Sequence, residues 1–193
     1  MEFYNELQRR SANSSSDIHQ HLPTLFEYGK TAERIIELGV RDGDSTTAFM
    51  AGIEIGGGEL WSCDTVAPKF LKQYQETCDR WTFELGDDVE RAPYAPNKVD
   101  VVFIDTSHAY EHTKAELEVY GSKVKPGGVI LLHDTELKSP ADAPGTDPDF
   151  PVRVAAEEYA NAKKWKLELV TGCYGLGIIH VPAKRTRKKA AAK

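Results

Sequence analysis

Apolar runs that alternate with helical patterns are the feature of this sequence that most constrains its fold. Five short runs rich in β-branched and aromatic residues predict strands over 34–40, 59–66, 81–87, 99–105 and 129–134. The segments between and after them predict helices over 45–55, 67–78, 109–122 and 151–163. Strands that alternate with helices are typical of βαβ units, so the sequence predicts an α/β fold with a parallel sheet.

Two further strand patterns close the series, at 165–171 and 175–181. The link between them is too short for a crossover, so these two strands are expected to be antiparallel. The runs at 99–105 and 129–134 are almost continuously apolar, as expected where helices cover both faces of a sheet. The predicted fold is a Rossmann-like, doubly wound, mostly parallel seven-stranded sheet with an antiparallel C-terminal strand pair, in a single domain.

A chain of 193 residues is long enough for one domain with a substantial core. We expect an N-terminal helical lid over 1–30, a main domain over 31–182 and a basic disordered tail over 183–193. Within the lid, Asp17 is expected to cap a helix, with Pro23 near its first turn or at a kink.

Hydropathy and cysteine usage bear on the location of the chain. No apolar run approaches the roughly 20 residues that span a bilayer, and the first residues lack the basic-then-apolar order of a signal peptide. Three scattered cysteines indicate reduced thiols. These features predict a cytoplasmic protein with no membrane contact.

Charge is unevenly distributed along the chain. The net charge is −6, but residues 184–193 carry six basic and no acidic side chains. The rest of the chain therefore has 18 basic and 30 acidic residues. An acidic body disfavours nucleic acid as a partner. The tail is interpreted as a solubilising end, and weak contact with nucleic acid is the alternative.

Polar residues occupy the C-terminal half of every predicted parallel strand. They are Glu37, Asp64, Gly86 with Asp87 and Asp88, Asp105, and His133 with Asp134. Ligands of open parallel sheets bind at this edge, near the switch in strand order. Each aspartate could instead cap the helix that follows, but their repetition along one edge favours a binding site.

The loop after the first strand, GVRDGDST, contains Gly39 and Gly43, which allow a tight turn close to a ligand. Ser45 or Thr46 can cap the next helix. The spacing matches neither the G-x-G-x-x-G pattern of dinucleotide sites nor the GK[ST] of a P-loop. A carboxylate such as Asp64 can accept hydrogen bonds from both ribose hydroxyls. An acidic edge favours the cationic S-adenosylmethionine over a polyphosphate.

The segment IIELGVRDGDST, at 35–46, resembles the first motif of class I S-adenosylmethionine-dependent methyltransferases. VDVVFIDTSHAYEHTKAEL and VKPGGVILLHDT, at 99–117 and 124–135, resemble the metal-dependent O-methyltransferases of the macrocin and mycinamicin type and their cephalosporin-hydroxylase-like relatives. The segment SDIHQHLPTL, at 16–25, is similar to one that precedes the first motif in such enzymes.

The resemblance implies a role for each matching residue. Residues expected around the methionine part of the cofactor are Glu37, Gly39, Gly43 and Ser45. Asp105 is expected both to bind the cofactor and to take part in catalysis. Asp64 would hold the ribose, and Gly86 and Asp87 would lie beside the adenine. Asp105 and Asp134 would bind Mg²⁺, and His108 would be the general base. The chain departs from the macrocin-type pattern at His133, where those enzymes carry an acidic residue.

The chemistry of these residues is consistent with methyl transfer to oxygen. Strands that are neighbours lie about 4.8 Å apart, so Asp105 and Asp134 could share one cation, although both could instead cap loops or bind the cofactor amine. An imidazole such as His108 titrates near neutral pH and suits a general base. Adjacent side chains in a strand point oppositely, so His133 and Asp134 face the same site only if the strand has ended.

The sequence therefore predicts an S-adenosylmethionine-dependent O-methyltransferase, assisted by Mg²⁺, that acts on a hydroxyl of a glycan or small natural product. The alternatives are a nucleic-acid methyltransferase anchored by the basic tail and a non-catalytic S-adenosylmethionine-binding module. The segment at 140–150 is expected to shape the acceptor pocket because it follows the strand at 129–134. The acceptor itself and the oligomeric state, a homo-oligomer included, are left open.

Overall fold

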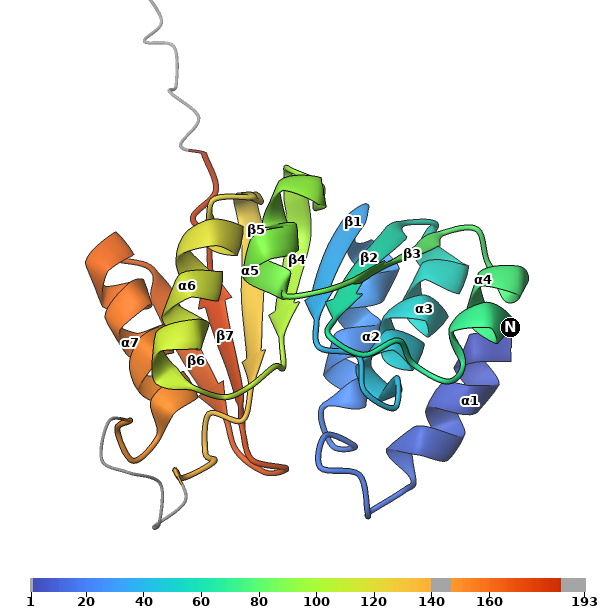
Figure 1. Ribbon diagram of the computed structural model, residues 1–193, viewed down its shortest axis with the longest axis horizontal. Helices are drawn as coiled ribbons and strands as arrows, with labels where there is room; N and C mark the ends of the chain where they lie inside the picture. Colours follow the sequence, from blue (N-terminus) through green and yellow to red (C-terminus); the bar gives the residue numbers. More distant parts are fainter. Residues whose placement is uncertain (1, 140–146, 185–193) are drawn as a thin grey trace, which may run out of the picture.

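The computed structural model describes residues 2–139 and 147–184 (Figure 1). The described residues form one seven-stranded sheet in the order β3-β2-β1-β4-β5-β7-β6. Its strands are β1 (Arg34–Leu38), β2 (Glu59–Asp64), β3 (Trp81–Leu85), β4 (Val99–Ile104), β5 (Val124–His133), β6 (Lys166–Val170) and β7 (Leu176–His180). Strands β1 to β5 are parallel, and β7 runs antiparallel to both β5 and β6. The predicted fold class is confirmed.

Helices cover both faces of the sheet (Figure 1). They are α1 (Glu2–Ser11), α2 (Leu22–Thr31), α3 (Asp44–Gly56), α4 (Leu71–Thr77), α5 (Asp88–Arg91), α6 (Tyr110–Gly121) and α7 (Pro151–Lys163), with a 3-10 helix, η1, at Ala92–Tyr94. Helices α1 to α4 pack on one face, and α5 to α7 pack on the other.

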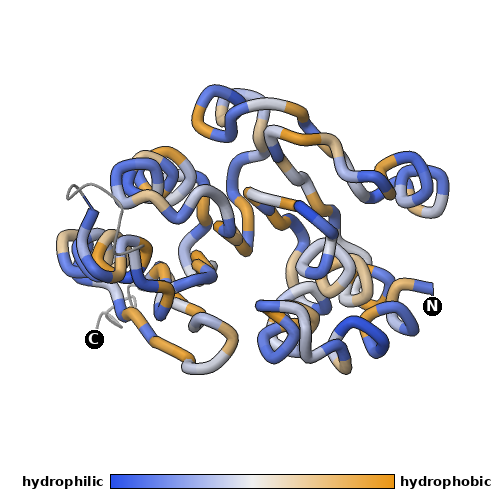
Figure 2. Tube along the Cα trace, turned by 60° about the horizontal axis from the view of Figure 1, so that its bottom comes forward, coloured by the Kyte–Doolittle hydropathy of each residue, from blue (hydrophilic) through white to orange (hydrophobic). Residues whose placement is uncertain are grey.

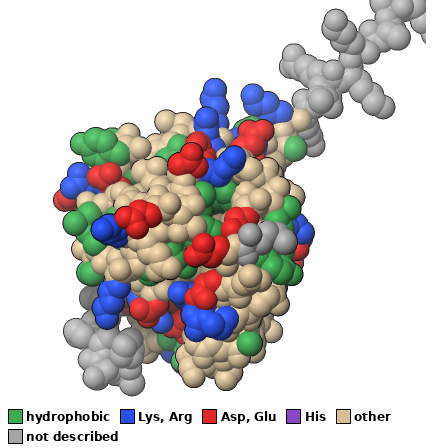
Figure 3. Space-filling view, turned by 90° about the vertical axis from the view of Figure 1, so that its right-hand side faces the viewer, with side chains coloured by type: hydrophobic (Ala, Val, Ile, Leu, Met, Phe, Trp, Pro, Cys, Tyr) green, Lys and Arg blue, Asp and Glu red, His purple; other side chains and the backbone are tan. Residues whose placement is uncertain are grey.

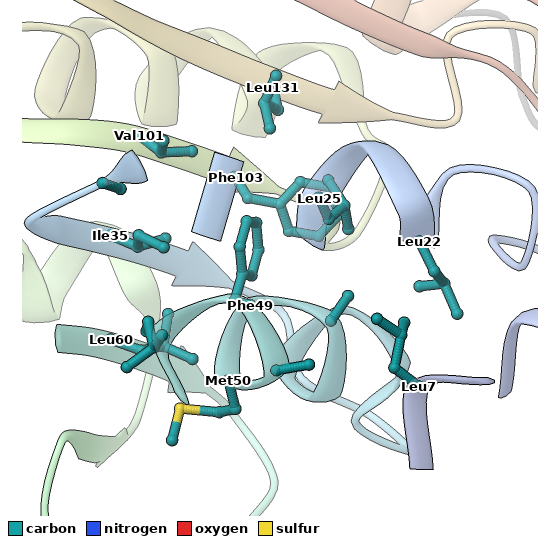
Figure 4. Packing of buried hydrophobic residues seen from close by; sticks show 14 of the residues in the cluster. Leu7, Leu22, Leu25, Ile35, Phe49, Met50, Leu60, Val101, Phe103 and Leu131 are labelled. Carbon is teal, nitrogen blue, oxygen red and sulfur yellow. The ribbon is translucent and has the colours of Figure 1, made fainter. Parts of the chain in front are cut away.

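The two faces have separate cores because successive side chains of a strand point in opposite directions. In β1, Ile35 joins the cluster under α2 and α3, whereas Ile36 joins the cluster under α6 and α7. In the first cluster, the rings of Phe49 on α3 and Phe103 on β4 meet edge to face, with centroids 5.7 Å apart (Figure 4). Figure 2 shows hydrophobic and hydrophilic residues interspersed along the helices, as expected where one side faces a sheet.

The N-terminal helices belong to this core. Phe3 and Leu7 of α1 and Leu22 and Leu25 of α2 are buried in the first cluster. Helices α2 and α3 approach closely at Gly29, where a Cβ atom would lie 2.8 Å from the Phe49 carbonyl oxygen. The segment at 1–30, expected as a lid, is thus packed into the domain. Its closure over a ligand stays a prediction.

Two local predictions, one in the N-terminal segment and one at β5, differ from the structure. Helix α2 begins at Leu22 with Pro23 in its first turn, so Asp17 does not cap it. The Asp17 carboxylate instead pairs with the Arg41 guanidinium at 2.9 Å. Strand β5 begins at Val124, and the segment 126–128 forms an irregularity inside it, where the register to β4 shifts. A bulge tolerates the missing N–H of proline, so the strand begins before the predicted start at 129.

In the described part of the chain, no helix combines the length and the hydropathy needed to cross a bilayer.

Candidate active site

A cavity of about 500 Å³ opens at the carboxyl ends of β1, β2, β3 and β4. A smaller cavity of about 180 Å³ continues it towards the start of α3. Both are lined by the loop after β1 and by the end of β4, including Gly39, Arg41 and Asp105. The two together form a groove along the edge that the sequence predicted as a binding site.

The loop after β1 is held against this groove by Asp64 at the end of β2. The Asp64 Oδ2 atom accepts hydrogen bonds from the backbone N–H groups of Val40 and Arg41, at 2.7 and 3.0 Å. Gly39 has φ of 84°, and a Cβ atom there would lie 1.9 Å from the Asp105 carbonyl oxygen. Only glycine allows β4 to end this close to the loop. Gly39 and Asp64 thus line the larger cavity, as expected.

Glu37 differs from its expected place beside a ligand. Its side chain is fully buried between β1, β2 and α3. The carboxylate accepts hydrogen bonds from the hydroxyls of Ser45, Thr46 and Ser62, at 2.7, 2.9 and 2.6 Å. Burial raises the Glu37 pKa to about 7, although the three hydroxyl donors oppose that shift. Glu37 therefore fixes the start of α3 from behind the cavity wall.

Two neighbours of Glu37 have different places. Ser45 lines the smaller cavity, as expected for a residue near the ligand. Gly43 is the N-cap of α3, with φ of 77°, and a Cβ atom there would lie 2.2 Å from the Phe70 ring. Packing against Phe70 requires glycine here, and the cofactor contact expected of Gly43 stays a prediction.

The far end of the larger cavity is formed after β3. Gly86, Asp87 and Asp88 all line it. The Asp87 side chain also caps α5 by accepting the Glu90 N–H at 3.0 Å. Asp87 therefore caps a helix, which was the alternative considered for it, and it also lines the cavity.

A buried acid pair lies beside this end of the cavity and was not predicted. Asp88 lies 3.0 Å from the His112 Nε2 atom, and Glu116 accepts the Thr106 hydroxyl at 2.8 Å. One oxygen of each carboxyl group is buried without a partner among the described residues. Burial and then the Asp88 carboxylate raise the Glu116 pKa to about 10. His112 and Glu116 are four residues apart on the predicted helix and therefore share one of its faces. This spacing is the sequence signal that could have pointed to the buried Glu116.

The other end of the groove holds two carboxylates and two imidazoles. The His108 Nε2 atom lies 2.8 Å from Asp134 Oδ2 and 3.5 Å from Asp105 Oδ1. The His133 Nδ1 atom lies 3.1 and 3.4 Å from the same two oxygens. The structure thus brings together Asp105, His108 and Asp134 as predicted, and it adds His133.

Backbone geometry explains how His133 and Asp134 reach one site. Strand β5 ends at His133, and Asp134 has φ of 64°. His108, in the loop after β4, has φ of 58°. Left-handed backbone at residues other than glycine costs about 1–3 kcal/mol, and it concentrates at functional sites. The condition stated from the sequence, that the strand must end before both side chains share a site, is met.

Charge in this cluster is balanced between the acids and the histidines. Burial opposes ionisation of Asp105, but the adjacent imidazoles of His108 and His133 outweigh it and lower the Asp105 pKa. The Asp105 and Asp134 carboxylates raise the His108 pKa to about 9. Burial disfavours a charged His133, yet the same carboxylates raise the His133 pKa to about 10. In the chain alone, these carboxylates thus favour protonation of both imidazoles.

The acceptor-pocket prediction for 140–150 falls mainly outside the described residues, because the structure does not describe 140–146. The same holds for the greater part of the basic tail, 185–193.

Comparison with known proteins places this geometry in a family. A methyltransferase domain model matches residues 36–135, more than half of the chain. An O-methyltransferase from Aspergillus thermomutatus is 24% identical over 127 residues, which are 62% of this chain and 53% of that protein. The chain thus spans about half the length of this curated relative, and 13% of the length of another that it matches.

Solved structures share the fold. A protein from Corynebacterium glutamicum has a TM-score of 0.69 at 17% identity, covering 87% of this chain and 83% of its own. An O-methyltransferase from Bacillus cereus, solved in complex with SAH, has a TM-score of 0.63 at 16% identity, covering 94% and 91%. With the family match over β1 to β5, the chain belongs to the methyltransferase domain family.

Proposed function

We propose that the protein binds S-adenosylmethionine and transfers its methyl group to a hydroxyl oxygen of a small molecule. One observation carries the proposal: a single groove has an acid-lined cavity of nucleoside-binding size at one end and the cluster of Asp105, His108 and Asp134 at the other. The similarity to O-methyltransferases, one of them solved with SAH, supports the same cofactor.

The larger cavity suits the adenosine part of the cofactor. Its volume of about 500 Å³ lies within the roughly 300–1,000 Å³ typical of small-molecule sites. We assign Asp64, at the end of β2, to the ribose and Asp87 to the adenine, because both line this cavity. The carboxylates along the groove favour a cationic sulfonium by Coulomb attraction.

The smaller cavity leads to the proposed reaction centre. Methyl transfer is an in-line displacement, in which the acceptor oxygen bonds to the methyl carbon while the carbon–sulfur bond breaks. The sulfonium becomes a neutral thioether, and the acceptor hydroxyl loses its proton. His108 lines this cavity and is the proposed proton acceptor.

The donor atoms of the cluster fit a divalent cation, which the resemblance implies is Mg²⁺. The ligand atoms of Asp105, His108 and Asp134 lie within 4.8 Å of one another. When bound, such an ion lowers the pKa of an acceptor hydroxyl. It also offsets the carboxylate charge that raises the His108 pKa to about 9. The proposed base role of His108 therefore depends on a cation held by Asp105 and Asp134.

A sugar or glycan hydroxyl is the proposed acceptor class, on the macrocin-type resemblance alone. A nucleic-acid acceptor is not favoured, because the chain without its last ten residues has an excess of acidic over basic side chains. A binding module without turnover would share the groove, so turnover is the measurement that separates the two.

Calorimetric titration with S-adenosylhomocysteine tests the cofactor, and Asp64→Asn is the informative variant. Asp100 provides a matched control, because its Oδ2 atom also accepts two backbone N–H groups, those of Glu33 and Arg34, at 3.1 Å each. Asp100 does not line the described groove. We expect binding to weaken roughly tenfold or more in Asp64→Asn and within twofold in Asp100→Asn. Absence of binding in the unaltered chain would overturn the proposal.

Transfer of a labelled methyl group to a panel of hydroxyl acceptors, sugars first, tests the reaction. In His108→Gln we expect turnover to fall by roughly 10²–10⁴-fold while S-adenosylhomocysteine binds as before. A variant that turns over at the original rate would remove His108 from the mechanism.

A further inference from the structure

His133 is the residue at which this chain departs from the carboxylate expected there. It is 2% exposed and ends strand β5, against β7. Its two ring nitrogens have different surroundings. Nε2 lies 2.8 Å from the Cys173 carbonyl oxygen, and Nδ1 faces Asp105 and Asp134.

The contact with Cys173 determines which nitrogen carries the proton in a neutral ring. A carbonyl oxygen only accepts, so the Nε2–H group donates to it. The Nδ1 lone pair of neutral His133 then points towards two carboxylate oxygens. The Nδ1 atom lies 3.4 Å from Asp105 Oδ1 and 3.1 Å from Asp134 Oδ2. Three electron-rich atoms this close repel one another unless a proton or a metal cation lies among them.

The hydrogen-bond geometry favours the metal over the proton. Although Nδ1 is buried and lies 3.1 and 3.4 Å from the two carboxylate oxygens, it makes no well-directed hydrogen bond with any described residue. A protonated Nδ1 would be expected to point its N–H group at one carboxylate oxygen. Imidazole ligands in metal sites commonly donate their second N–H group to a backbone carbonyl, as Nε2 does here.

We propose that His133 Nδ1, Asp105 Oδ1 and Asp134 Oδ2 are ligands of a first-row transition-metal ion, such as Mn²⁺, Fe²⁺, Co²⁺ or Zn²⁺, in preference to Mg²⁺. Magnesium demands oxygen ligands, whereas imidazole nitrogen suits the transition ions. His108 lies at the same two oxygens and is reserved for the acceptor proton. The inference rests on the proposed function, since it names the ion for that reaction centre.

The test uses the full chain, stripped of metal by a chelator, and two probes, Mn²⁺ and Mg²⁺. Bound Mn²⁺ is measured by electron paramagnetic resonance, and Mg²⁺ is added in competition. We expect Mg²⁺ to be needed at roughly 100-fold or greater excess to displace half of the Mn²⁺. In His133→Glu, which restores an oxygen ligand, the required excess should fall roughly tenfold.

Nitrogen ligation has its own spectroscopic readout. Electron spin-echo modulation from ¹⁴N should accompany Mn²⁺ in the unaltered chain and be lost or reduced in His133→Glu. His180→Gln is the matched control, because His180 lies at the opposite end of β7, near Glu168, and should change neither readout. His108→Gln reports whether a second imidazole contributes.

Three outcomes would overturn the inference: no Mn²⁺ binding, a metal preference unchanged in His133→Glu, or ¹⁴N modulation that disappears only in His108→Gln. Should His133→Glu fail to fold by circular dichroism, His133→Gln removes the imidazole with a neutral side chain and is measured in the same way. S-adenosylhomocysteine titration of the same samples separates the two proposals. Retained cofactor binding without nitrogen ligation rejects only the ion, whereas nitrogen-ligated Mn²⁺ without cofactor binding rejects the proposed function.

Discussion

Glu116 is fully buried in α6 beside the larger cavity, and its ionisation is linked to the free energy of unfolding. Its pKa is 4.5 in a solvated chain and about 10 in the folded protein. Between these values the folded state keeps the proton that the unfolded state releases. Stability from this group is therefore complete below pH 4.5 and is lost as the pH rises towards 10.

The variant Glu116→Gln mimics the protonated acid at every pH and still accepts the Thr106 hydroxyl. We expect it to match the unaltered chain near pH 4.5 and to exceed its stability at pH 8 by about 1–3 kcal/mol. Urea unfolding across this range measures the difference. Glu118→Gln, at an exposed position of the same helix, should give a flat difference. A flat difference for Glu116→Gln as well would mean that the group is ionised in the fold.

The positions of some site residues could be predicted from the sequence, whereas those of others could not. Asp64, Asp105, His108 and Asp134 could be predicted, because each follows a recognisable strand at one edge of the sheet. Glu37 has the same pattern but belongs to the face covered by α3, so its side chain is enclosed. The direction of a side chain at a strand end depends on the last backbone angles. Those of Asp134 became visible only in the structure.

At the scale of elements, the close approach of the loop after β1 to the end of β4 controls the shape of the groove. In Gly39→Ala, the new Cβ atom would overlap the Asp105 carbonyl oxygen and would also require a left-handed backbone. We expect a loss of about 3 kcal/mol or more in the free energy of unfolding, together with weaker S-adenosylhomocysteine binding. Urea unfolding and calorimetry measure the two effects.

Gly127 in β5 is the matched control for backbone strain. Its φ is 91°, and a Cβ atom there would have its nearest described neighbour at 3.9 Å. Gly127→Ala should therefore cost only about 1 kcal/mol and leave ligand binding unchanged. Equal losses in the two variants would assign the effect to the backbone angle alone.

The helices and strands were predicted reliably where an apolar pattern repeated along the chain. They were predicted poorly where contacts with distant parts of the chain determine the local structure. Strands β1 to β4 and helices α3, α6 and α7 lie within one or a few residues of the predicted ranges. Helix α1 was not predicted as a separate element, because only Phe3 and Leu7 of its ten residues are buried. Asp17 was assigned to a helix cap, but its pairing with Arg41 depends on a loop that is distant in the sequence.

At the scale of the whole molecule, charge is distributed in a way that bears on the acceptor. Figure 3 shows acidic and basic side chains interspersed over the face it presents, which favours neither polyanion nor polycation as a partner there. The larger cavity of the groove is lined by Asp64, Asp87, Asp88 and Asp105, so a phosphate backbone would meet repulsion there.

Deletion of residues 184–193 tests whether the basic tail recruits an acceptor. The deletion removes six positive charges and leaves 18 basic and 30 acidic residues. If the acceptor is a small hydroxyl compound, kcat/KM for it should change less than twofold, since the described lining of the groove comes from residues 17–112. If the tail anchors a nucleic acid, kcat/KM should fall steeply on deletion, and the activity of the full chain should decline with added salt. Turnover of the two forms at 50 and 200 mM salt separates these outcomes, because neutral acceptors have no counterions to release.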